Sequence, residues 1–111
     1  MRRSARAWVL AMAIGALTSA PAAAQPDGKA LYEKDCVKCH GTDGKAQTKQ
    51  GRLVKAHSFF DEPKLATGEA PAHVLTSIRE KKKHKPVAKK LDDEQIRAVG
   101  EYVRFLVGSG E

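Results

Sequence analysis

Two thiols and an imidazole stand together in this chain, as Cys36, Cys39 and His40. Thiols three positions apart lie on one face of a helical turn, so both can add to the two vinyl groups of one haem. The histidine that follows directly can then offer its imidazole to the iron. This spacing is typical of c-type haem attachment. It predicts one covalent haem c, bonded through Cys36 and Cys39, with His40 as an iron ligand.

Other uses of a Cys-x-x-Cys pair fit the sequence less well. A structural zinc site needs two further ligands of matching type, and the chain has only two cysteines. A thioredoxin-like redox pair needs a strand–helix–strand frame, and the alternating apolar runs of such a frame are missing. A disulfide at this spacing in a helix is sterically poor.

The first 24 residues have the pattern of a secretory signal. Arg2, Arg3 and Arg6 precede an apolar run over residues 7–17, and small residues follow at 22–24. This order predicts cleavage before Gln25, and the apolar run is too short to span a membrane. We therefore expect a leader at 1–24, a single haem-binding domain at 25–111, and no stable membrane insertion after cleavage. An uncleaved anchor is the alternative.

Export fits the attachment chemistry, because the cysteines must reach the haem reduced and outside the cytoplasm. The expected location is the bacterial periplasm. Removal of the three leader arginines lowers the formal charge from +7 to +4. A domain this small buries only a modest core, and a covalent haem would enlarge it.

Two helices are predicted near the ends of this domain. Asp27 is a suitable N-cap for a helix leading to the cysteines. Asp92 and Gln95 form a capping box for a last helix that continues to Gly108. Gly28 and Gly100 are small enough to let these two helices approach closely.

The middle of the domain has a weaker pattern. Residues 41–67 predict a loop with at most one short helical turn, in which Phe59 and Phe60 are expected to pack, although not both inward. Apolar residues at helical spacing predict a helix over about 72–79. The lysine-rich run over 80–90 predicts a loop, because like charges oppose a regular element and Pro86 favours an extended Lys85.

The order of these elements resembles that of class I c-type cytochromes, over nearly all of residues 26–108. The matching parts are the Cys-x-x-Cys-His motif, Gly28 and Tyr32 in the first helix, and Tyr102 and Leu106 in the last. The resemblance implies an all-α, small cytochrome c-like fold, with three main helices around one covalent haem. It also implies a contact between the two terminal helices at these glycine and aromatic positions.

The sequence departs from that family at two places. The family's glycine-proline pair, whose proline carbonyl accepts the proton of the axial imidazole, corresponds here to Gly51-Arg52. The family's sixth ligand is a methionine ahead of the last helix, but the only methionines here are Met1 and Met12, within the predicted leader.

Several residues could replace that methionine. The candidates are His84, Lys85 or another lysine, His57, His73, or no ligand at all. His84 lies close to the methionine's usual place. Deprotonating a lysine at pH 7 costs about 4–5 kcal/mol, whereas histidine is already mostly neutral. We therefore expect His84 to be the second metal ligand.

An iron with two imidazole ligands has no free position for a substrate. The chain is therefore predicted to be a soluble one-electron carrier of low potential, not an enzyme. The lysines of the 81–90 run are expected to bind an acidic docking surface on redox partner proteins. Nucleic acid is not an expected partner. The alternatives are a haem-based sensor or small-ligand binder with an open sixth site, and a haem subunit of a periplasmic dehydrogenase.

Overall fold

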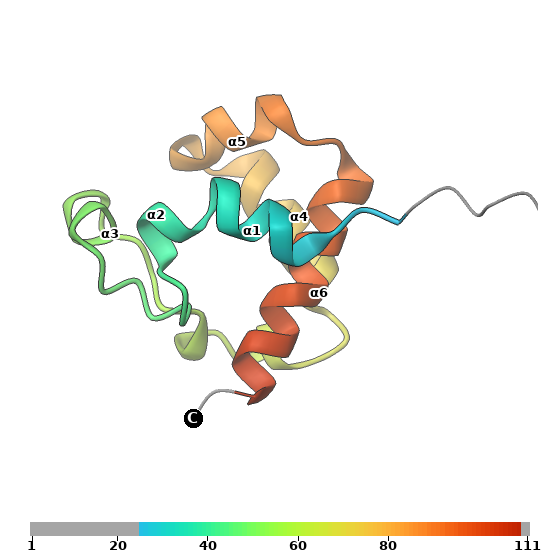
Figure 1. The fold of residues 1–111 in the computed structure, drawn as a ribbon, viewed down its shortest axis with the longest axis horizontal. Coiled ribbons are helices and arrows are strands. Elements are labelled where there is room, and N and C mark those ends of the chain that lie inside the picture. Colours follow the sequence, from blue (N-terminus) through green and yellow to red (C-terminus); the bar gives the residue numbers. More distant parts are fainter. Residues whose placement is uncertain (1–24, 110–111) are drawn as a thin grey trace, which may run out of the picture.

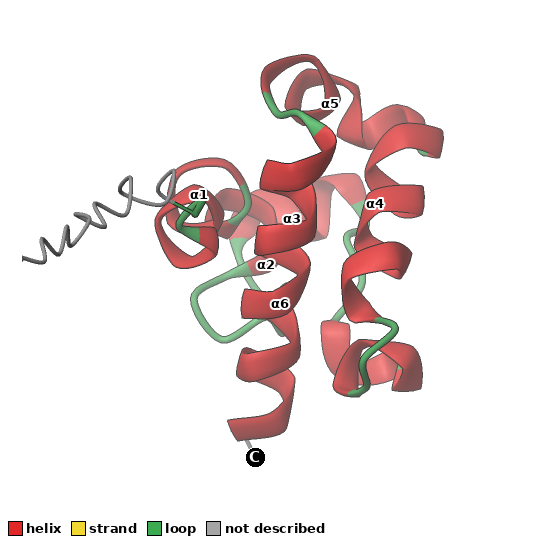
Figure 2. Cartoon of the chain, turned by 90° about the vertical axis from the view of Figure 1, so that its right-hand side faces the viewer, coloured by secondary structure: helices red, strands yellow, loops and turns green. Residues whose placement is uncertain are grey.

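The computed structural model of the chain describes residues 25–109, and every regular element in this range is a helix (Figure 1, Figure 2). The predicted leader at 1–24 lies outside the described residues. The elements are α1 (Gly28–Asp35), α2 (Val37–His40), α3 (Lys49–Val54), η1 (Phe59–Asp61), η2 (Pro63–Ala66), α4 (Ala70–Glu80), η3 (Lys82–His84), α5 (Lys85–Lys90) and α6 (Asp93–Ser109). The all-α prediction is confirmed.

Local capping sets the starts of the two terminal helices. The Asp27 carboxylate accepts a hydrogen bond from the Ala30 amide at 3.1 Å, which begins α1. Before α6, the Asp92 carboxylate accepts from the Gln95 amide at 2.8 Å, and the Gln95 side chain accepts from the Asp92 amide at 2.9 Å. Both predicted caps are confirmed, and each satisfies amides that the helix itself leaves without acceptors.

The core forms where α6 packs against α1 and α4. Its largest fully buried side chains are Tyr32, Ile96, Val99 and Val103. The rings of Tyr32 and Tyr102 lie 5.3 Å apart between the terminal helices, as the resemblance implied. These contacts give α6 a partner along its whole apolar stripe.

Two glycines permit close helix contacts, but with different partners. A Cβ on Gly28 would overlap the carbonyl of Ala98, so the approach of α1 to α6 depends on this glycine. A Cβ on Gly100 would instead overlap Pro71 at the start of α4. The prediction for Gly28 is confirmed. The one for Gly100 is wrong, because Gly100 lies against α4 and not against α1.

The lysine-rich run is helical, so the prediction of a loop over 80–90 is wrong. It forms η3 and α5, and Lys85 has helical dihedral angles of φ −53° and ψ −43°. Pro86 lies in the first turn of α5, where a missing amide proton costs no helix hydrogen bond. The lysines on this run are exposed, so water screens the repulsion that was expected to prevent a helix.

The middle of the chain holds more helix than predicted, in α3, η1 and η2. Its two adjacent phenylalanines diverge, as expected. Phe59 packs against the core cluster, while the Phe60 ring lies under the Lys45 ammonium at 5.6 Å. Phe59 is therefore the one available to shape the interior.

Candidate functional site

The cysteines, His40 and His84 line one cavity, with a volume of about 550 Å³. Side chains from α1, α2, α4, η3 and α6 contribute to its wall, together with the segment from Val54 to Phe59. Ligand sites are commonly a few hundred to about a thousand cubic ångströms in volume, and mostly apolar with a few polar groups. This cavity has the size and lining of such a site.

The two cysteines lie where the chain passes from α1 to α2. Cys36 ends α1, and its amide donates to the Tyr32 carbonyl at 2.8 Å. The His40 amide donates to the Cys36 carbonyl at 3.0 Å, which closes one helical turn around the motif. Both thiols are free and half-buried. The rest of the motif therefore occupies a separate short helix, α2, directly after α1.

Burial keeps the first thiol protonated in this fold. It raises the pKa of Cys36 to about 12, with a further contribution from the neighbouring Asp35 carboxylate. Asp35 is itself paired with Lys90 of α5 at 3.3 Å. That ion pair links the helix before the motif to the lysine-rich segment.

The His40 ring is fixed on one side of the cavity. Its Nδ1 lies 3.2 Å from the carbonyl oxygen of His57, and the Phe59 ring stacks on it with centroids 4.5 Å apart. Because a carbonyl can only accept, Nδ1 must carry the proton, which leaves a lone pair on Nε2. Burial, helped by the nearby His84, lowers the pKa of His40 to about 4, so the ring is neutral at pH 7.

The carbonyl that orients His40 belongs to His57, so the assignment of this role to Arg52 is wrong. α3 ends at Lys55 in a left-handed conformation, with φ 58° and ψ 46°. That turn redirects the chain and places the next carbonyls beside the motif. Gly51 has another role, because a Cβ there would overlap the Cys39 carbonyl.

The His84 ring is held in a matching way by α4. Its Nδ1 lies 3.0 Å from the Ser77 carbonyl oxygen, with the Ser77 hydroxyl at 3.4 Å. Donation to the carbonyl again places the proton on Nδ1 and leaves the lone pair on Nε2. The rings of His40 and His84 lie 6.3 Å apart, with 35° between their planes.

This ring separation tests whether the residues fit a haem iron. With metal–nitrogen bonds of about 2.0 Å and ring centroids about 1.2 Å beyond each nitrogen, imidazoles on opposite sides of one metal lie about 6.4 Å apart. The observed 6.3 Å agrees with that value. The residues present therefore fit a haem whose iron lies between the two rings.

The other candidate ligands lie elsewhere in or near the cavity. His73 lines it from α4, but its Nε2 lies 3.9 Å from a Glu62 carboxylate oxygen. His57 contributes its backbone carbonyl to the His40 side, and its side chain is exposed. Lys85 is exposed and lies outside the lining of the cavity. His84 is the candidate whose ring faces that of His40, with the ring centroids 6.3 Å apart.

Sequence reasoning missed Ser77 and the carbonyl of His57. Ser77 lies seven residues before His84, at the position where α4 passes the ring. Its contribution is a backbone carbonyl, and every residue has one. The sequence therefore held no signal for either contact.

None of the helices within residues 25–109 is both long enough and apolar enough to cross a membrane.

Comparison with known proteins adds to this geometry. The family described as cytochrome c oxidase, cbb3-type, subunit III matches residues 23–103. The cbb3-type cytochrome c oxidase subunit CcoP of Azospirillum brasilense is 31% identical over 91 residues, or 81% of this chain. The chain spans 31% of the length of that relative. No solved structure gives a significant match.

Proposed function

Since the chain belongs to the cbb3-type cytochrome c oxidase subunit III family, whose domains are c-type cytochromes, we propose a one-electron carrier with its iron between His40 and His84. Membership agrees with the resemblance to class I c-type cytochromes and with one covalent haem c. Domains of this kind carry electrons and do not themselves catalyse a reaction.

The spacing of the two imidazoles carries the proposal. Both rings line the cavity at a separation that suits one metal, and a backbone carbonyl orients each of them. Such carbonyls fix the tautomer and raise the basicity of a ligating histidine. In this proposal Cys36 and Cys39, which line the same cavity, form the two thioether bonds.

Held by the imidazoles of His40 and His84, the haem would supply a one-electron redox couple with no free position for a substrate. Methionine ligation raises the potential of a haem, and axial ligands shift potentials over about 0.8 V. With His84 in place of methionine, the potential lies well below that of a His/Met cytochrome. The Phe59 ring stacks on the His40 ring and so covers one face of that imidazole.

The proposed location is the periplasm. It is supported by the basic, apolar and small-residue order of residues 1–24, which is typical of a cleaved export signal. In this proposal the described domain functions as a soluble protein after cleavage.

A redox titration of the purified holoprotein tests the function. We expect a midpoint potential well below the range of His/Met cytochromes, and an absorption spectrum of the reduced protein that is unchanged by carbon monoxide. A strongly positive midpoint would contradict His84 ligation. Rapid carbon monoxide binding would favour the sensor or small-ligand binder instead.

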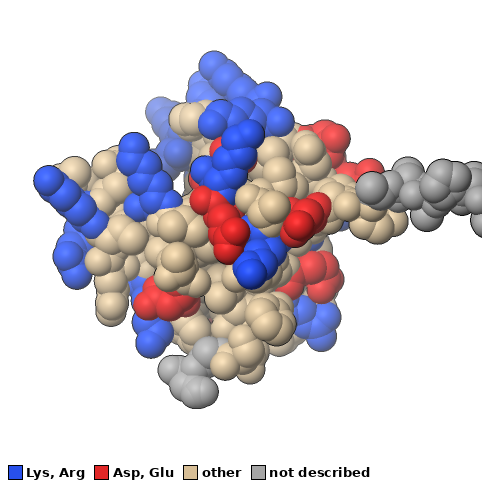
Figure 3. All heavy atoms as spheres, viewed as in Figure 1, with Lys and Arg blue, Asp and Glu red and all other residues tan. Residues whose placement is uncertain are grey.

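A lysine surface beside the cavity supports an acidic redox partner. Lys81, Lys82 and Lys83 line the cavity and are exposed, and Figure 3 shows basic side chains gathered over the end of the molecule formed by α5. Such a field steers acidic partners toward the haem edge. The named relative is an oxidase subunit, which fits electron exchange with another protein.

Oxidation of the reduced protein by hexacyanoferrate(III) tests this lysine surface. The rate should fall as ionic strength rises, because salt screens the attraction for the anion. At low salt, K82E combined with K85E should slow oxidation about threefold or more. The matched control is K29E combined with K34E, which makes the same charge change on α1, outside the cavity lining. A rate independent of salt, or an equal loss in the control, would contradict docking through this surface.

A further inference from the structure

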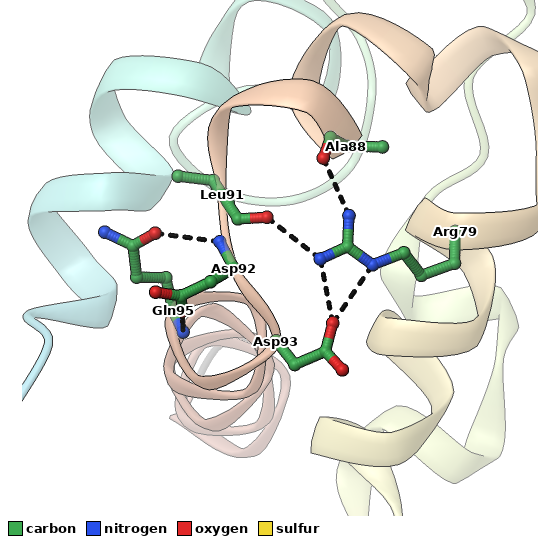
Figure 4. Close-up of polar contacts among 6 residues, drawn as sticks. All are labelled: Arg79, Ala88, Leu91, Asp92, Asp93 and Gln95. Carbon is green, nitrogen blue, oxygen red and sulfur yellow. Dashed lines mark hydrogen bonds and ion pairs between the residues drawn. The ribbon is translucent and has the colours of Figure 1, made fainter.

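The Arg79 side chain joins three parts of the chain near the end of α4 (Figure 4). Its Nη1 donates to the Ala88 carbonyl at 2.7 Å, and its Nη2 donates to the Leu91 carbonyl at 2.9 Å. Its Nε and Nη2 also donate to one carboxylate oxygen of Asp93, at 3.1 and 2.8 Å. One guanidinium therefore makes four hydrogen bonds.

These acceptors lie at the far end of the segment that carries His84. The chain leaves α4 after Glu80, passes through η3 and α5, and returns at the start of α6. Arg79 lies at the beginning of this excursion, and its partners Ala88, Leu91 and Asp93 lie at the end. The guanidinium therefore holds together the two ends of the segment formed by residues 80–92.

The same helix also holds the His84 ring. Ser77, two residues before Arg79, provides the carbonyl that His84 Nδ1 contacts. α4 thus fixes the ring through Ser77 and the return of the segment through Arg79. If the two ends of this segment separated, the Ser77 contact would be the main restraint from α4 on the His84 ring.

We propose that Arg79 is a positioning residue for the sixth ligand, and that its guanidinium keeps His84 over the iron by closing the 80–92 segment. This inference rests on the proposed ligation by His84. Arg79 does not touch the cofactor in this role. It acts through the backbone of α5 and through Asp93.

The chemistry of the contacts requires arginine. Ala88 lies in the last turn of α5 and Leu91 is its C-cap, where helix carbonyls lack internal partners and favour a cation. The planar guanidinium presents several donors in a rigid fork, whereas an ammonium is a point charge. Lysine at this position keeps the charge but cannot bridge two carbonyls and a carboxylate in the same way.

Carbon monoxide binding to the reduced holoprotein measures how often His84 leaves the iron. In R79Q we expect the binding rate to rise about tenfold, which corresponds to about 1.4 kcal/mol in the opening equilibrium. R79K should give a smaller rise, because the charge remains while the fork is lost. Equal rates in R79Q and the unsubstituted protein would overturn the proposal.

D92A is the matched control. It removes the carboxylate that accepts the Gln95 amide at the same end of α6, but none of the four hydrogen bonds of Arg79 involves Asp92. We expect a carbon monoxide rate within about twofold of the unsubstituted protein. A rise in D92A as large as that in R79Q would show that any weakening at the start of α6 releases His84, and it would overturn the proposal.

Two further outcomes separate this inference from the function on which it rests. If R79Q yields no holoprotein, D93A decides, because it removes the carboxylate that accepts two of the four Arg79 hydrogen bonds and keeps both carbonyl bonds. A faster carbon monoxide binding rate in D93A supports the proposal, and an unchanged rate overturns it. Rapid binding by the unsubstituted protein would instead overturn His84 ligation itself, and with it any role for Arg79 in positioning the ligand.

Discussion

Replacement of His84 by alanine is expected to convert the ferric protein from low-spin to largely high-spin, because the iron loses one of its two strong nitrogen ligands. The reduced variant should bind carbon monoxide about a hundredfold faster or more, since no protein ligand has to leave first. Electron paramagnetic resonance measures the spin state, and stopped-flow absorption measures the binding rate.

His73→Ala is the matched control for this experiment. His73 is another histidine that lines the cavity, but its Nε2 lies 3.9 Å from a Glu62 carboxylate oxygen. The H73A protein should stay low-spin and closed to carbon monoxide. A low-spin H84A protein, or a high-spin H73A protein, would show that the sixth ligand has been assigned to the wrong residue.

The double substitution of Cys36 and Cys39 by alanine should abolish covalent haem attachment. The exported product should lack the mass of one haem in intact mass spectrometry and should not stain for haem on a denaturing gel. Much of the helical circular dichroism should also be lost. The cavity would then lack its tethered occupant, and a core this small rarely supplies more than about 3–5 kcal/mol of stability.

Variants within the same motif define the cause of that loss. Lys38 lies between the cysteines and is exposed, so K38A should keep both the haem mass and the helical signal. Each single cysteine variant retains one thiol and should keep some covalent haem. A double variant that still carries the full haem mass would contradict attachment through these two residues.

The helix ends could be predicted because their signals are local. Asp27 caps an amide three residues away, and Asp92 and Gln95 cap each other. Such contacts form within a single turn whatever the rest of the chain does. The Cys-x-x-Cys-His spacing is local in the same sense, which is why it pointed to the cofactor before any fold was known.

The lysine-rich segment could not be predicted, because tertiary contacts support its helices. Arg79 bonds carbonyls at the end of α5, Lys90 pairs with Asp35, and the Lys83 ammonium donates to the Val54 carbonyl. The last two contacts join residues that are 55 and 29 positions apart in the sequence. Charge density and Pro86 indicated a loop because those contacts cannot be read from the sequence.

The contacts that orient the two imidazoles could not be predicted for a related reason. The carbonyls of His57 and Ser77 orient the two imidazoles, and a carbonyl leaves no trace in the residue type. The family pattern suggested Arg52 for the first of these roles. Instead, the chain turns at the left-handed residue Lys55, and the carbonyl of His57 contacts His40.

The contact between Gly28 and Ala98 implies an order of events during maturation. It joins segments separated by 70 positions, so it forms only after α6 has emerged and the intervening chain has condensed. Val99 and Val103 of α6 line the cavity beside the two cysteines, so this wall of the cavity is complete only once the final helix has docked.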